Sequence, residues 1–343
     1  MLITVDVLIG SGRVRGRRVA ADVVAHLGVP YAAPPFGPHR FAPPRPVVAW
    51  PGVRDGTRFG PVAPQSAVID GMPRWRPGEE DVLTVNVWAP VGARGLPVLF
   101  WVHGGANTFG SGAQRDFDGI ALARTGLVVV TGNHRVGFEG FGHVDGFPDN
   151  RGLLDLSASL AWVREEIAAF GGDPARVTAA GQSSGATSVA CLTATGLFHR
   201  AILHSPPDLH VTPARAKATF AGFPLGTPAE VVEASDRLAV SYQPVLESSP
   251  LSTIPDDVPL LLCHTANEDA LFTEPVRALA ARHPNARLLC FAIPPARHND
   301  EIAYAFGHRD DRLRDVWTRF ATTGHPGFDG ESVLEPWGLD SGH

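Results

Sequence analysis

The chain has 343 residues, of which 44% are hydrophobic and 19% are charged, as in folded globular proteins with a sizeable core. Its formal net charge of −6 argues against a nucleic-acid partner, because no basic stripe is present to meet phosphates. No segment approaches the run of about 20 apolar residues that a membrane span requires, so we expect no membrane partner.

The N-terminal part of the chain predicts strands joined by proline-rich connections. Residues 3–20 indicate two strands around a Gly-Ser-Gly turn, and a proline-rich loop follows to about Gln65. Residues 81–90, DVLTVNVWAP, have the apolar–polar alternation of a strand. Residues 96–105, LPVLFWVHGG, and 127–135, LVVVTGNHR, contain continuous apolar runs that are typical of strands buried on both faces.

Helices and strands alternate in the remainder of the chain. Residues 152–170 predict a helix that Gly171 and Gly172 end, with one apolar face formed by Leu153, Leu156, Leu160, Val163, Ile167 and Phe170. Strands are predicted at 176–180, 258–266 and 286–293, and helices at 186–192 and 311–324. This order predicts a single α/β domain over residues 1–343, with a mainly parallel sheet covered by helices on both faces.

The pentapeptide GQSSG, residues 181–185, joins a predicted strand to a predicted helix. Such a turn can raise Ser183 as a nucleophile. Because the chain has 37 glycines, a chance match to G-x-S-x-G has a probability of roughly one in five, so the pentapeptide alone decides nothing. Its position is more informative, since reactive sites of parallel sheets gather at the carboxyl ends of the strands.

An activated serine needs a base, an acid that orients the base, and donors for the oxyanion. In α/β-hydrolases these groups follow the chain order serine, acid, histidine, and a glycine-rich turn after an earlier strand supplies donors. Here Glu268 follows the strand at 258–266, His298 follows the strand at 286–293, and HGGA follows LPVLFWV. The sequence therefore offers a candidate at each required place.

Several longer segments resemble one branch of the α/β-hydrolases, the cholinesterase-like type-B carboxylesterases. The resemblance covers nearly the whole chain and rests on GVPYAAPPFGPHRFAPP, EEDVLTVNVWAP, DNRGLLDLSASLAWVREEIAAFGGDPARVTAAGQSSGA, GLFHRAILHS, NEDALF, HNDEIAYAFG and VWTRFATTGHP, in the family's order. It implies an α/β-hydrolase fold and a serine esterase.

The resemblance also implies a role for individual residues. Ser183 matches the nucleophile, Glu268 the acid and His298 the base. The backbone N–H groups that form the oxyanion hole in the family fall at three positions: Gly105, Ala106 and Ser184. Asp269 stands where the family usually has glycine, and a second carboxylate there could compete for the histidine or raise the pKa of the acid.

Two departures from the family bear on the substrate. Asn107 stands where the family usually has an aromatic residue, and we interpret it as a substrate-binding residue that favours a polar substrate; a simple loop variant is the alternative. The chain is also shorter than typical members, after AILHSPP and between Glu268 and His298. This shortening predicts a reduced cap and a more open site, which would equally accept a bulky substrate.

We therefore predict a serine carboxylic-ester hydrolase that acts on a small-molecule ester, bulky or polar, through a Ser-His-Glu triad and an acyl-enzyme. Two alternatives stay open: an acyl transferase, lactone-forming enzyme or cyclase of a natural-product pathway, and a catalytically inactive binding module. No cofactor and no metal site are expected, because no Cys/His/Asp cluster has ligand spacing. The oligomeric state is not predicted.

The cysteines and the N-terminus bear on the cellular compartment. Cys191, Cys263 and Cys290 lie in apolar runs without a C-x-x-C pair, so we expect them to be buried and unpaired. The N-terminal segment lacks a basic start, and its apolar stretch is too short and interrupted for a signal peptide. Both features predict a cytoplasmic protein.

Overall fold

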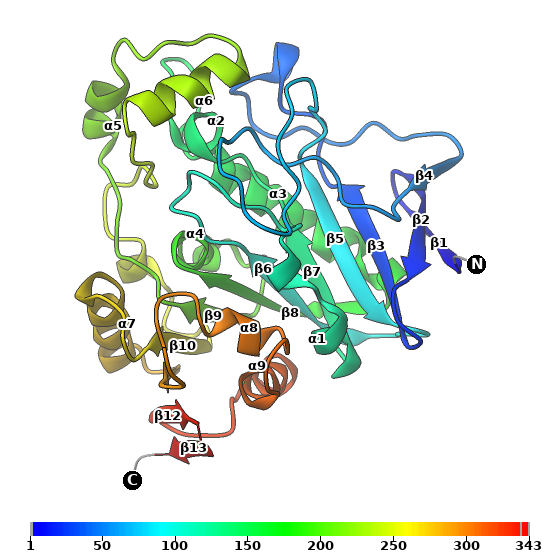
Figure 1. The fold of residues 1–343 in the computed structure, drawn as a ribbon, viewed down its shortest axis with the longest axis vertical. Helices are drawn as coiled ribbons and strands as arrows, with labels where there is room; N and C mark the ends of the chain where they lie inside the picture. The colour runs from blue at the N-terminus through cyan, green and yellow to red at the C-terminus, as the bar shows by residue number, and fades with distance from the viewer. Residues whose placement is uncertain (1–2, 337, 342–343) are drawn as a thin grey trace.

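The strands and helices of residues 3–336 and 338–341, which the computed structural model describes, build one sheet of 13 strands with helices packed against it (Figure 1). The strands are β1 (Thr4–Ile9), β2 (Gly12–Arg18), β3 (Val23–Pro30), β4 (Val53–Asp55), β5 (Thr84–Pro90), β6 (Leu96–Val102), β7 (Val128–Gly132), β8 (Gly172–Gln182), β9 (Arg200–His204), β10 (Leu260–Thr265), β11 (Ala286–Phe291), β12 (Glu331–Glu335) and β13 (Gly338–Ser341). The α-helices are α1 (Ile120–Arg124), α2 (Gly137–Phe141), α3 (Arg151–Glu166), α4 (Ser184–Leu192), α5 (Pro213–Phe220), α6 (Pro228–Arg237), α7 (Ala270–Arg282), α8 (Ile302–Ala305) and α9 (Arg312–Thr323).

The centre of the sheet is parallel, and its outer strands pair mostly antiparallel, apart from the short parallel pair of β2 and β4. The strand order is β1-β2-β3-β5-β7-β6-β8-β9-β10-β11-β12-β13, and β4 pairs with β2. Every neighbouring pair from β7 through β12 in that order is parallel. The predicted mainly parallel sheet is therefore confirmed for the part that carries the site.

Both faces of the central strands are buried. In β6, Val98, Phe100 and Val102 join one apolar cluster with α3, α4 and α7, whereas Leu99 and Trp101 join a second cluster with α1, α8 and α9. Alternating side chains of a strand point to opposite faces. A continuous apolar run is therefore what a strand covered by helices on both sides requires, as the sequence predicted.

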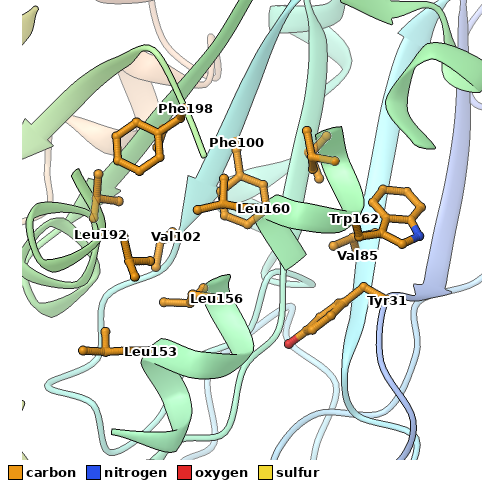
Figure 2. Packing of buried hydrophobic residues seen from close by; sticks show 14 of the residues in the cluster. Tyr31, Val85, Phe100, Val102, Leu153, Leu156, Leu160, Trp162, Leu192 and Phe198 are labelled. Carbon is orange, nitrogen blue, oxygen red and sulfur yellow. The ribbon is translucent and has the colours of Figure 1, made fainter. Parts of the chain in front are cut away.

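The predicted helix at 152–170 is confirmed, although its last part is tighter than an α-helix. Helix α3 runs to Glu166, a 3-10 turn covers Ile167–Phe170, and Gly171 ends it in the left-handed region with φ 86°. Figure 2 shows how Leu156 and Leu160 of α3 pack in the same cluster as residues of β6. Leucines at this spacing bury one face of the helix against the sheet.

One prediction about the N-terminal region was wrong in part. The proline-rich loop predicted to extend to about Gln65 contains β4 and the fully buried β3. His26 and Gly28 interrupt the apolar run of β3, which is why this strand was not predicted. The pairing of β3 with β5 has a register irregularity at the same place. The alternating strand at 81–90 is β5, but its polar residues are buried as well: Asn86 accepts the N–H of Gly28 at 2.9 Å and donates to Thr131.

A small cap covers one end of the sheet. It comprises residues 206–255, which include α5 and α6, and Figure 1 places α6 beside α2. Helix α6 begins at a capping box in which Thr227 and Glu230 exchange hydrogen bonds. Phe220 and Phe223 of the cap pack on Phe138 of α2. No helix in the described ranges is long and apolar enough to cross a membrane.

Candidate active site

Ser183 lies on the tight turn between β8 and α4. Its φ of 55° and ψ of −129° are strained for a residue with a Cβ, and its N–H donates to the carbonyl oxygen of His204 at 2.8 Å. A Cβ atom at Gly181 would lie 2.6 Å from the backbone of Gly185, and one at Gly185 would lie 2.4 Å from the carbonyl oxygen of Val102. Both glycines are therefore required by close backbone packing.

The loop after β6, residues 103–107, is the glycine loop. Its backbone is left-handed at Gly105 and Ala106, and Thr108 and Phe109 donate their N–H groups to the carbonyl oxygen of Gly105. Within the described ranges, the N–H groups of Gly105 and Ala106 donate no hydrogen bond. The N–H of Ser184 belongs to the first residue of α4, which has no intrahelical partner. These three groups are suited to bind an oxyanion.

His103 shapes the glycine loop. It is buried, its Nδ1 lies 2.8 Å from the carbonyl oxygen of Gly104, and its ring stacks on His134 with centroids 4.5 Å apart. Burial lowers the pKa of His103 to about 4. The ring is therefore neutral near neutral pH and only weakly basic.

Glu268 and His298 meet directly. Oε1 of Glu268 lies 2.6 Å from Nδ1 of His298, while Oε2 accepts the hydroxyl of Ser205 at 2.8 Å and the N–H of Thr265 at 2.9 Å. Burial raises the pKa of Glu268, but the hydrogen bonds from His298, Ser205 and Thr265 outweigh it and leave the pKa below its ordinary value. The carboxylate is therefore charged and holds Nδ1 of the imidazole.

Asp269 has a different task from its neighbour. It is the N-cap of α7, and its Oδ1 accepts the N–H of Leu271 at 2.9 Å. The structure thus differs from the alternative in which Asp269 competes with Glu268 for the histidine or raises the pKa of that acid.

His298 makes two further contacts that the sequence analysis did not predict. Its Nε2 lies 2.9 Å from the side-chain nitrogen of Gln182, and its ring stacks on Phe272 with centroids 4.0 Å apart. Since Nδ1 donates to Glu268, Nε2 is the acceptor for the Gln182 amide. Among the described residues no hydrogen bond joins the hydroxyl of Ser183 to His298. In the sequence, these two residues differ from others only by lying close to predicted site residues: Gln182 directly precedes Ser183, and Phe272 follows Glu268 by four residues.

A pocket of about 150 Å³ opens beside Ser183. It is lined by the glycine loop, by α4 and by three further segments: Ala106, Asn107, Ser183, Ser184, Thr187, Pro207, Leu209, Ser241, Tyr242, Gln243, Pro244, Leu271 and Phe272. A larger cavity of about 580 Å³ lies at the amino ends of the parallel strands and contains none of the predicted site residues. We assign the site to the smaller pocket, because it lies at the carboxyl ends of the strands.

Asn107 lines this pocket, but its side chain is already engaged by the protein. Its Nδ2 donates to the carbonyl oxygen of Tyr242 at 3.1 Å, and the residue is 7% exposed. This hydrogen bond uses one of the two N–H groups of the amide and ties Asn107 to the cap. No group of three or more His, Cys, Asp or Glu side chains that could hold a metal occurs in the described part of the chain.

Comparison with known sequences places this geometry in context. Residues 3–235 match the sequence profile of the carboxylesterase family. Fumonisin B1 esterase of Sphingopyxis macrogoltabida is 37% identical in an alignment 305 positions long that covers 77% of this chain and 56% of that protein. Para-nitrobenzyl esterase of Bacillus subtilis is 38% identical in an alignment 295 positions long that covers 72% of this chain and 60% of that protein. The chain thus spans less than two thirds of the length of these relatives.

Solved structures agree with the sequence matches. A structure of PNB esterase aligns with a TM-score of 0.88 at 28% identity, over 98% of this chain and 96% of the other. The carboxylesterase EST55 of Geobacillus stearothermophilus aligns with a TM-score of 0.84 at the same identity and over the same shares of the two chains. These matches confirm the predicted α/β-hydrolase fold and the resemblance to type-B carboxylesterases.

Proposed function

The chain belongs to the carboxylesterase family, and from this premise we propose that it hydrolyses carboxylic esters of small molecules through a covalent acyl-enzyme. The observation that carries the proposal is the 2.6 Å contact between Glu268 and His298, on the same edge of the sheet as the strained Ser183. A charged, buried acid that orients an imidazole beside an elevated serine is the arrangement that acyl transfer to serine needs.

In the first half-reaction, the hydroxyl oxygen of Ser183 bonds to the ester carbonyl carbon and its proton passes to Nε2 of His298. The carbonyl oxygen becomes negative and accepts the N–H groups of Gly105, Ala106 and Ser184. His298 then gives the proton to the alcohol oxygen, the bond between that oxygen and the acyl carbon breaks, and the alcohol leaves.

In the second half-reaction, His298 takes a proton from water and the resulting hydroxide attacks the acyl-enzyme. The bond to Ser183 breaks, the serine regains its proton, and the acid leaves. Glu268 keeps the proton of the neutral imidazole on Nδ1 and stabilises the imidazolium. Because the Gln182 amide donates a hydrogen bond to Nε2, it must move aside before Ser183 can pass its proton to that nitrogen.

The intact mass of the protein after incubation with a small fluorophosphonate tests this proposal. An activated Ser183 displaces fluoride and gains one phosphonyl group, and Ser183→Ala gains none. An adduct on the wild type together with turnover of p-nitrophenyl acetate supports a hydrolase. An adduct without turnover favours the acyl-transfer or cyclase alternative, and no adduct on folded protein favours the binding module.

Two further proposals concern the chain as a whole. We infer a single domain, which is supported by one sheet that extends from the N-terminal strands to β13. We also propose a reducing, cytoplasmic location, which is supported by three free cysteines, Cys191, Cys263 and Cys290.

A further inference from the structure

Five residues of the cap, 241–245, form one wall of the pocket beside Ser183, and we call them the pocket strap. Four of them, 241–244, line the pocket directly, opposite the glycine loop and α4. The pocket of about 150 Å³ is smaller than the roughly 300–1,000 Å³ of sites that enclose drug-sized ligands. The position of the pocket strap therefore sets how large a group fits beside the serine.

The pocket strap is held to the core of the protein by two asparagines. Asn107 of the glycine loop donates its Nδ2 to the carbonyl oxygen of Tyr242 at 3.1 Å. Asn150, at the start of α3, donates to the carbonyl oxygen of Val245 and accepts its N–H, both at 2.7 Å. Of these two asparagines, Asn107 bonds to a residue that lines the pocket, whereas Asn150 bonds to Val245, which does not.

The other side of the pocket strap is attached to the cap. The ring of Tyr242 stacks on Phe220 of α5, and its hydroxyl lies 2.6 Å from the hydroxyl of Ser235 in α6. Val211 bonds to the backbone on both sides of Val245. Motion of the small cap would therefore move the pocket strap, unless the hydrogen bond from Asn107 keeps it against the glycine loop.

The acyl part of an ester is the part that this pocket suits. The alcohol oxygen must lie at Nε2 of His298 to receive its proton, and the side chain of His298 is 32% exposed. The alcohol is therefore on the open side of the site. The carbonyl oxygen faces the glycine loop, which leaves the part of the pocket lined by the pocket strap, Thr187 and Pro207 for the acyl chain.

We propose that Asn107 is a specificity-determining residue that fixes the pocket strap and so restricts the enzyme to esters of short-chain acids, while the alcohol can be bulky. This inference rests on the proposed esterase function and adds the substrate class. Asn107 acts through the pocket strap and not by contact with the reacting atoms.

The variants must remove the hydrogen bond from Asn107 to Tyr242 without changing the backbone conformation of the glycine loop. Asn107 has φ 57°, a conformation that asparagine, aspartate and glycine tolerate better than alanine does. Asn107→Asp keeps the shape and places an acceptor against the carbonyl oxygen of Tyr242. Asn107→Gly removes the side chain altogether. Asn285→Asp is the matched control, because Asn285 also donates its amide to a backbone carbonyl, that of Asp256, away from the pocket.

The experiment measures kcat/KM for p-nitrophenyl acetate, butyrate, hexanoate and octanoate, and for acetates of alcohols of increasing size. We expect the wild type and Asn285→Asp to prefer the short acyl chains strongly and to discriminate weakly among the alcohols. In Asn107→Asp and Asn107→Gly the ratio of acetate to octanoate should fall about tenfold or more, a discrimination typical of hydrophobic pockets. The ratio within one variant cancels any general loss of activity.

Hydrogen exchange at Val245 and Leu246 gives a second readout that does not depend on activity, and it should quicken in both Asn107 variants. An unchanged acyl ratio in these variants, with a wild type that hydrolyses esters, overturns the inference and leaves the proposed function intact. A wild type that neither reacts with the fluorophosphonate nor hydrolyses any ester overturns both.

Discussion

Nδ1 of His298 lies 2.6 Å from a carboxylate oxygen of Glu268, whose side chain is fully buried. The second oxygen of this carboxylate accepts one hydroxyl and one backbone N–H. Every donor around Glu268 thus favours the charged acid, and the charged acid fixes the proton of a neutral imidazole on Nδ1. Nε2 then carries the lone pair that can take a proton once the Gln182 amide moves aside.

Glu268→Gln tests the charge of the acid with little change in shape. The amide can present its NH₂ to His298 and hold the wrong tautomer, so kcat should fall by about 10⁴, as for amide substitutions of triad acids in other serine hydrolases. The steady-state rate of p-nitrophenyl acetate hydrolysis measures this fall in kcat. Asp269→Asn is the control: asparagine is also a good N-cap for α7, so kcat should stay at the wild-type level. Equal losses in both variants would contradict the assignment of the acid.

The pH dependence of stability should carry the signature of Glu268. Its hydrogen bonds hold the pKa in the folded state below the ordinary value of 4.5, so the unfolded state binds this proton more readily. The stabilisation is fully present above that value and is lost as the pH falls through the folded pKa. Urea unfolding should therefore show a constant difference between wild type and Glu268→Gln near neutral pH, which shrinks in acid. A difference that grows in acid would contradict the lowered pKa.

Gln182 should influence the acid limb of the pH–rate profile. Its amide donates to the neutral Nε2 of His298, whereas a carboxylate at that position would accept a proton from the protonated ring. A hydrogen bond to a charged group contributes about 1.5–3 kcal/mol, so in Gln182→Glu the acid limb of kcat/KM should move up by roughly 1–2 pH units. Gln182→Met supplies a neutral side chain of similar size that neither donates to Nε2 nor accepts from the protonated ring, so the limb should move less than in Gln182→Glu. Because the pH dependence of kcat/KM reports on the free enzyme, an unmoved limb in Gln182→Glu would show that this side chain does not face Nε2 before the substrate binds.

Local signals explain why the turn at Ser183 and its flanking elements could be predicted. The apolar run of β8, the two glycines and the small residues of α4 lie within one short stretch, and each favours the observed structure. Strand β3 was missed because His26 and Gly28 interrupt its apolar pattern. What those residues do depends on partners elsewhere: the N–H of Gly28 bonds to Asn86, on another strand.

The sequence predicted which residues form the site better than it predicted which of them contact one another. Resemblance to the family indicated Glu268 and His298, and the structure brings the two into contact. The contacts of Gln182 with His298 and of Asn107 with Tyr242 join residues 116 and 135 positions apart. Such pairs depend on how the loops return to the sheet, and neither periodicity nor spacing contains that information. Asn107 was therefore interpreted from its position alone, as a residue that faces the substrate.

The elbow itself allows a steric prediction with a closely matched control. Gly181 has an ordinary strand conformation, so Gly181→Ala strains no dihedral angle, but its Cβ would lie 2.6 Å from the backbone of Gly185, which cannot rotate away. Overpacking of this kind costs about 1–3 kcal/mol, and the shift would also displace the turn that carries Ser183. Gly338→Ala makes the same change where no described atom other than those of the chain neighbours lies within 4 Å of the new Cβ, and φ is likewise not positive. The temperature of thermal unfolding and the fraction of protein labelled by the fluorophosphonate should therefore both fall in Gly181→Ala. Neither should fall in Gly338→Ala. Normal labelling of Gly181→Ala would mean that the turn can relax without moving its serine, and close packing would then not be what requires glycine there.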